Sequence, residues 1–114
     1  MARKGIRKSS AIITVAAAAT AENLYLLTVG GAVTRSVILK KIWAYSAIGN
    51  CIVTIGTGLA GAFAAIIPPM LVLNGMDNTW TEEDIPEREM FANLTIQSSV
   101  LGVQVQVEVE EIGF

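Results

Sequence analysis

Histidine is absent from the 114-residue chain, and cysteine occurs only once, as Cys51. Without histidine the chain lacks the commonest general base and the commonest ligand of transition metals. One cysteine excludes an internal disulfide and a thiolate metal cluster, and we interpret Cys51 as a small, buried apolar side chain. No catalytic residue, cofactor or metal ligand is assigned, and we expect a protein that is not an enzyme.

Charged residues are scarce as well. They make up 16% of the chain, against 53% hydrophobic residues, whereas soluble domains average about 25% charged residues. We expect the surplus apolar surface to be covered in contacts between subunits. No residue from 42 to 76 is charged, but Gly and Pro residues divide that stretch into strand-sized pieces. Such punctuation argues against a membrane span.

Residues 101–112 alternate strictly between apolar and polar side chains. The apolar row comprises Leu101, Val103, Val105, Val107 and Val109. The polar row comprises Gln104, Gln106, Glu108 and Glu110. A period of two is typical of a strand with one buried and one wet face. The polar row is either an ordinary wet face or a surface that binds a subunit or a ligand.

Similar short segments, separated by turn residues, occur along the whole chain. We expect strands at residues 10–16, 23–29, 33–45, 51–55, 63–67, 70–73, 90–97 and 101–112. The last two are predicted to form an antiparallel hairpin through Ser98 and Ser99. The pattern therefore predicts an all-β fold, a two-sheet antiparallel sandwich of about eight strands that is jelly-roll-like.

The predicted strand at residues 33–45 is apolar on both faces. Strict alternation places one set of side chains on one face, namely Val37, Leu39, Trp43 and Tyr45. The same alternation places Ile38 and Ile42 on the opposite face. Such a strand is either central between two packed layers or has its second face in an interface. We assign the Val37 face to a subunit interface.

Basic residues crowd the N-terminus, and they are Arg3, Lys4, Arg7 and Lys8. We divide the chain into a basic arm, residues 1–9, and a single β-sandwich domain, residues 10–114. The arm is either a solvated tail or a segment that binds a nucleic acid or an acidic partner, because clustered cations gain affinity by releasing counterions. An apolar stretch follows at residues 11–19, shorter than the ~20 residues that span a bilayer.

Two motifs suggest chemistry that their surroundings do not support. Residues 56–61 read G-x-G-x-x-G, as in dinucleotide-binding folds, but Pro68 and Pro69 leave no room for the helix that must follow. The polar segment 77–88 contains clustered carboxylates, yet their spacing does not match a calcium loop. We expect a glycine-rich turn and a solvated loop in which Thr81 begins a single turn that ends before Pro86.

The chain resembles the small jelly-roll or β-sandwich structural proteins of virions, the capsid and cement (decoration) proteins of phages and other icosahedral viruses. The resemblance rests on general pattern: the basic arm from Arg3 to Lys8, strands between Ile38 and Ile55, the Pro68-Pro69 corner and the closing strand. It implies a capsid or decoration subunit, located in the virion, that associates with itself, commonly as a trimer, and with other capsid subunits through its arm.

An alternative is a secreted or cell-surface β-sandwich that binds a ligand or forms a filament. Residues 1–21 would then act as a secretory signal, with a basic start, an apolar core and the small-residue sequence Ala19-Thr20-Ala21. An enzyme ranks third, because it would need a pocket in which several polar groups converge.

Overall fold

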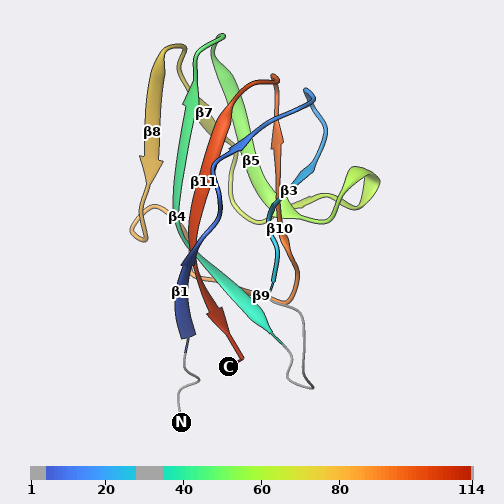
Figure 1. Ribbon diagram of the computed structural model, residues 1–114, viewed down its shortest axis with the longest axis vertical. Coiled ribbons are helices and arrows are strands. Elements are labelled where there is room, and N and C mark those ends of the chain that lie inside the picture. The colour runs from blue at the N-terminus through green and yellow to red at the C-terminus, as the bar shows by residue number, and fades with distance from the viewer. Residues whose placement is uncertain (1–4, 28–34, 114) are drawn as a thin grey trace.

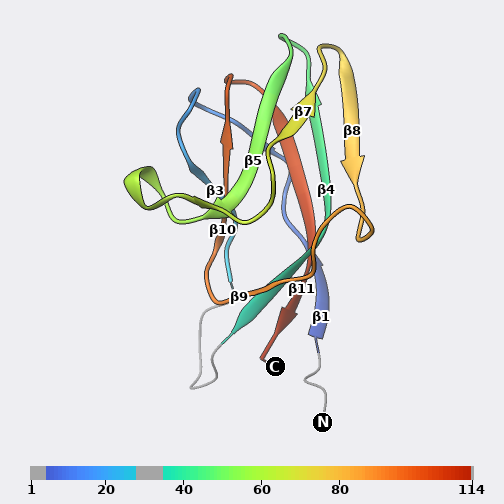
Figure 2. The ribbon, with the colours of Figure 1, turned by 180° about the vertical axis from the view of Figure 1, so that it is seen from behind.

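The computed structural model describes residues 5–27 and 35–113, which form two antiparallel sheets packed face to face (Figure 1; seen from behind in Figure 2). The larger sheet contains β1 (Gly5–Ser9), β2 (Ile13–Thr14), β4 (Ser36–Ser46), β8 (Met76–Trp80), β9 (Glu89–Met90) and β11 (Gln104–Ile112). The smaller sheet contains β3 (Glu22–Tyr25), β5 (Cys51–Thr57), β6 (Ala64–Ala65), β7 (Met70–Val72) and β10 (Leu94–Ser98).

Three positions in the sheets are each filled by two short strands. β1 and β2 both pair with β11, β8 and β9 both pair with β4, and β6 and β7 both pair with β5. The larger sheet then has the order β1, β11, β4, β8, and the smaller sheet the order β3, β10, β5, β6. This is the strand order of an eight-stranded jelly roll. The predicted fold is therefore confirmed.

Side chains from the facing surfaces of the two sheets form the core. The larger sheet contributes Val103, Val105, Val107 and Val109, none more than 1% exposed. The smaller sheet contributes Val53, Ile55, Leu94 and Ile96, all fully buried. The predicted alternation of the last strand is confirmed, although Leu101 lies in the preceding turn and is exposed. Cys51 is buried in the same core as predicted, and burial raises the pKa of its thiol.

The predicted hairpin between the last two strands is wrong. β10 pairs with β3 and β5 in the smaller sheet, whereas β11 pairs with β1, β2 and β4 in the larger sheet. The chain crosses from one sheet to the other at residues 99–102, where Gly102 has a φ of 85°. Alternating side chains are expected both for two strands paired in one sheet and for two strands that face each other from different sheets. The sequence pattern alone could therefore not distinguish these two arrangements.

A β-bulge interrupts β4. On its neighbour β11, Glu108 and Val109 are consecutive, whereas their partners on β4 are Lys41 and Leu39. Lys40 is therefore an extra residue in the ladder. Successive side chains of a strand point to opposite faces of the sheet. This one extra residue therefore exchanges the faces to which the side chains after the bulge would otherwise point.

The bulge corrects the predicted faces of β4. Val37 and Leu39 point into the core and are 0% and 5% exposed. Ile42, which strict alternation had placed on the opposite face, also points into the core and is fully buried. Trp43 and Tyr45 lie on the outer face of the larger sheet, opposite Gln106 and Gln104 of β11. A subunit interface that includes Val37 and Leu39 is therefore wrong, because neither side chain reaches the surface.

The segment predicted to be a polar loop begins instead as a strand. β8 pairs with β4, and Trp80 at its end packs against the core. The single turn expected next is present: Thr81 N donates to Asp84 Oδ2 at 3.0 Å, and Asp84 N donates to Thr81 O at 2.9 Å. The chain leaves this turn before Pro86, as predicted.

The N-terminal residues also differ from prediction. Gly5–Ser9 form β1, which pairs with β11 from Gly5 opposite Ile112 to Ser9 opposite Glu108. Arg7 and Lys8 therefore belong to the sandwich and not to an arm, which corrects the predicted division at residue 9. Arg3 and Lys4 lie outside the described residues.

The G-x-G-x-x-G sequence forms a tight connection between β5 and β6. It contains a three-residue 3-10 turn, Ala60–Ala62, and the chain then runs back antiparallel along β5. This agrees with the predicted glycine-rich turn. In the part of the chain that the structure describes, no helix is long and apolar enough to cross a membrane.

Candidate assembly surface and outer sheet face

One end of the sandwich carries no charge on its connections. Four connections meet there, at the top of Figure 1, and they comprise residues 15–21, 47–50, 73–75 and 99–102. Hydrogen bonds join them in pairs: Asn74 N donates to Asn50 Oδ1 at 2.9 Å, and Gly102 N donates to Val15 O at 2.8 Å. None of the four contains Asp, Glu, Lys or Arg. We call this part of the molecule the uncharged end.

Large apolar side chains are exposed at or beside the uncharged end. Among the described residues, eleven large hydrophobic side chains are exposed, and six of them belong here: Ile48, Ile52, Leu71, Leu73, Met76 and Leu101. Ile52 and Leu71 are direct partners on β5 and β7, so they share the outer face of the smaller sheet. Leu71, Leu73 and Met76 line one groove, which also includes Asp77 and Asn78 of β8. Large exposed apolar patches often mark contact sites, so this surface is a candidate for one.

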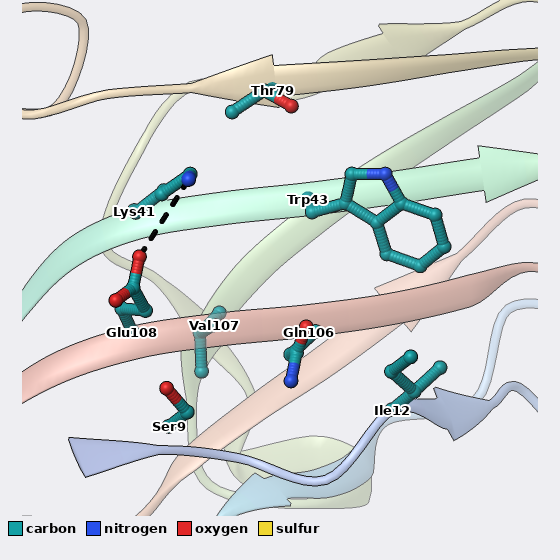
Figure 3. Close-up of a pocket in the computed structure, with 8 residues that line it drawn as sticks. All are labelled: Ser9, Ile12, Lys41, Trp43, Thr79, Gln106, Val107 and Glu108. Carbon is teal, nitrogen blue, oxygen red and sulfur yellow. Dashed lines mark ion pairs between the residues drawn. The ribbon is translucent and has the colours of Figure 1, made fainter.

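The outer face of the larger sheet contains a shallow hollow of about 290 Å³ beside Trp43 (Figure 3). It is lined by Ser9, Ile12, Lys41, Trp43, Thr79, Gln106, Val107 and Glu108. Trp43 and Ile12 lie on one side, and Lys41 and Glu108 lie on the other. The indole is held in place because Trp43 Nε1 donates to Asp77 Oδ2 at 3.0 Å.

Ion pairs occupy the rest of this outer face. They join Arg7 to Glu82, Lys40 to Glu87 and Glu110, and Lys41 to Glu108. These pairs are at least partly exposed, so each contributes little to stability. Because each cation has an acidic partner nearby, these three do not form the continuous basic surface that is typical of nucleic-acid binding.

The structure separates the residues that the sequence grouped together. Of the predicted interface, Val37 and Leu39 lie in the core. Trp43 lines the hollow, and it also borders a depression that it shares with Tyr45, Gly75 and Asp77. Of the predicted arm, Arg7 pairs with Glu82 and Lys8 with Glu111. No surface brings these sets together.

A buried charged cluster was missed by the sequence analysis. Glu111 is fully buried, and its Oε2 lies 2.8 Å from Lys8 Nζ. Tyr25 of the opposite sheet also forms a hydrogen bond with Glu111. The signal was present, because position 111 continues the buried row two residues after Val109. The cluster joins β1, β11 and β3, and so ties the N-terminal strand to both sheets.

Alkaline pH should reveal this cluster through Tyr25. Burial, together with the charge of Glu111 and its hydrogen bond, raises the pKa of Tyr25 from 10.0 to about 12. The unfolded chain releases the tyrosine proton at lower pH than the folded chain, so stability is present below pH 10 and is lost as pH rises toward 12. We expect a loss of roughly 2–3 kcal/mol across that interval.

The measurement is urea unfolding at a series of alkaline pH values for the wild type and for Tyr25→Phe. Lysine residues also titrate in this range, so the difference between the two proteins isolates Tyr25. The variant should show a shallower decline of unfolding free energy above pH 10. Parallel curves for the two proteins would contradict the assignment.

Among the residues that the structure places, no three His, Cys, Asp or Glu side chains are grouped so that they could hold a metal ion.

No family model and no curated protein matches the sequence. A solved structure of Bacillus endospore appendages, described as a novel family of disulfide-linked pili, matches with a TM-score of 0.54 and 13% identity. That match covers 100% of this chain and 92% of the other.

A structure of infectious bursal disease virus, Gx strain, matches more weakly, with a TM-score of 0.39 and 14% identity. It covers 97% of this chain and 31% of the viral chain. At these identities the appendage likeness shows a shared fold, and the viral likeness is too weak to support an argument.

Proposed function

We propose that this chain is a structural subunit that assembles with copies of itself through its uncharged end. The observation that supports the proposal is the group of exposed apolar side chains around connections that carry no charge. A partner that covers these side chains must offer apolar side chains of its own, because a charge that is buried against them without a counter-charge costs free energy. A second copy of the same end meets that requirement.

The physical basis of assembly is the removal of apolar surface from water. Burying a fully exposed Leu or Ile side chain contributes roughly 1.5–3 kcal/mol, and these side chains are about half exposed in the free subunit. Several must therefore be covered together before the contact offsets the cost of association. Tyr45 borders the same end and is included in the proposed interface. Contacts repeated across many subunits sum to a stable assembly.

The specific form of the assembly that we propose is a viral shell, in which the chain acts as a capsid or decoration subunit in the virion. This role needs no catalytic residue and no cofactor. Its partners are other copies, possible trimers among them, and other capsid subunits. Arg7 and Lys8 form ion pairs within the subunit. The proposed contact of the N-terminal residues with an acidic surface or a nucleic acid therefore rests on Arg3 and Lys4.

A second candidate is a secreted or cell-surface subunit that builds a filament. The fold match over 92% of a pilus-forming chain favours this alternative over other extracellular roles. Shell and filament subunits both need self-association, so the two candidates differ in the shape of the product. Electron microscopy of concentrated protein separates them, because closed particles support the shell and extended fibres support the filament.

The test of assembly replaces two apolar side chains of the uncharged end, Ile48→Ser and Leu71→Ser, in one variant. Light scattering across a range of concentrations should show the wild type as an oligomer and the double variant with at least tenfold weaker association. The matched control is Phe91→Ser, because Phe91 is 61% exposed and directly follows β9, which lies toward the other end of the sandwich (Figure 1). A monomeric wild type, or equal weakening by the control, would refute the proposal.

A further inference from the structure

We infer that the hollow beside Trp43 binds a neutral saccharide. A sugar ring has flat patches of C–H groups and a rim of hydroxyls, and the hollow offers a complement to each. Trp43 and Ile12 form an apolar side, and Ile12 is 54% exposed although it is a large hydrophobic residue. Lys41 and Glu108 form the polar side. Ligand sites of this kind combine aromatic contact with a few placed polar groups.

Several polar groups at the hollow have capacity for a ligand. The hydroxyls of Ser9 and Thr79 make no hydrogen bond to any other residue that the structure describes. Gln106 donates its amide nitrogen to Ser10 O at 3.0 Å, which leaves its amide oxygen as an acceptor. Hydroxyl groups both donate and accept, so a sugar can satisfy this mixed set.

The charges at the hollow favour an uncharged ligand. Lys41 Nζ and Glu108 Oε2 lie 3.7 Å apart, and the two side chains are 48% and 44% exposed. Their charges offset each other, so among the residues that line the hollow neither an anion nor a cation meets an unpaired counter-charge. The separation is longer than a direct hydrogen bond, and one sugar hydroxyl can donate to the carboxylate while it accepts from the ammonium group.

The hollow is built on strands, which hold its side chains in place before a ligand arrives. Lys41 and Trp43 belong to β4, Thr79 to β8, and Gln106 to β11. Hydrogen bonds to Asp77 and Ser10 already orient the Trp43 indole and the Gln106 amide. A preformed site loses less entropy on binding. Its volume of about 290 Å³ is at the small end of ligand sites, which suits a mono- or disaccharide.

The inference goes beyond the proposed assembly role. The hollow shares no lining residue with the six apolar side chains of the uncharged end. Subunit contact and saccharide binding are tested with different variants, and Trp43 of the hollow meets the proposed interface only at the depression that it shares with Tyr45. Together they would describe a structural subunit whose exposed sheet face attaches to glycans.

The test uses tryptophan fluorescence of the full chain. The protein has two tryptophans, so Trp80→Phe serves as the reference background in which emission comes from Trp43 alone. The probes are glucose, galactose, mannose, N-acetylglucosamine, maltose, cellobiose and lactose. At least one should give a saturable change with a Kd in the millimolar range, as expected for a shallow site. Glucose 6-phosphate and glucosamine should bind more weakly than their neutral parents.

In the same background, Thr79→Val with Glu108→Gln should weaken binding at least tenfold, because both changes remove groups that face the ligand. Thr54→Val is the matched control, since Thr54 lies on β5 of the other sheet, and it should leave the Kd unchanged. The inference is overturned if no probe gives a saturable change, if the charged analogues bind as well as the neutral sugars, or if the control weakens binding as much.

Discussion

Replacing Lys8 with methionine is expected to lower the free energy of unfolding by about 3 kcal/mol. Glu111 is fully buried, and the Lys8 ammonium lies 2.8 Å from its carboxylate. Removing the ammonium takes a close counter-charge away from a buried carboxylate, which costs more than the loss of an exposed pair. Because 32% of the Lys8 side chain is exposed, the expected loss lies at the low end for such pairs. Denaturant unfolding at pH 7 measures it.

Two further variants separate the lost charge from general damage to β1. Lys8→Met combined with Glu111→Leu should recover most of the loss, because removing both members of a buried pair is often neutral. Arg7→Met is the matched control on the same strand, since Arg7 and its partner Glu82 are both more than half exposed. It should cost less than about 1 kcal/mol. Equal losses for Lys8→Met and Arg7→Met would show that the buried pair has no special role.

Alanine at Gly56 is expected to destabilise the protein by about 2–3 kcal/mol. A Cβ at this position would overlap the carbonyl oxygen of Ala64 on the paired strand and lie 2.9 Å from Phe63 Cε1. Since the obstacle is backbone, relief requires β5 and β6 to separate. Thermal unfolding should show the loss as a lower Tm for Gly56→Ala.

The control for this prediction comes from the same glycine motif. A Cβ on Gly61 meets no atom within 4 Å, so Gly61→Ala should change stability by less than about 0.5 kcal/mol. A clear loss of stability for Gly56→Ala together with little change for Gly61→Ala would show that Gly56 is required for the close approach of two strands. If Gly61→Ala is as damaging as Gly56→Ala, that explanation is wrong.

Much of the fold could be predicted from the sequence because the core is built from regular alternation. The valine row of β11 specifies one buried face without any knowledge of its neighbours, and Gly49-Asn50 and Asn74-Gly75 mark the chain reversals. Counting such segments gave a two-sheet sandwich of about eight strands, as observed. Local pattern was sufficient wherever a strand follows one period from end to end.

The prediction failed where the answer depended on a distant part of the chain. β8 has the sequence Met-Asp-Asn-Thr-Trp and no apolar alternation, and it is a strand because the edge of β4 offers backbone partners. The Lys40 bulge shifts the period within β4, and only the register with β11 reveals it. The pairing of β10 was misjudged for a related reason, since facing strands and paired strands share one pattern.

The candidate sites were less predictable than the fold. The basic N-terminal residues suggested an arm, yet Lys8 forms an ion pair with the buried Glu111 and Arg7 forms one with Glu82 on a loop. Trp43 was predicted to lie in a subunit interface with Val37, but the bulge places the two side chains on opposite faces of the sheet. The hollow combines residues from β1, β4, β8 and β11, and the sequence holds no signal that brings these together.

The bulge at Lys40 also governs which genetic changes this protein can tolerate. A substitution alters one side chain of β4 and leaves the others in place. Loss of the single codon for Lys40 would instead restore an unbroken period across the strand. If the lower half kept its register, Ile42 and Ala44 would turn toward solvent, and the rings of Trp43 and Tyr45 would turn toward the core. A one-residue deletion at Lys40 would therefore disturb more of this strand than a single substitution would.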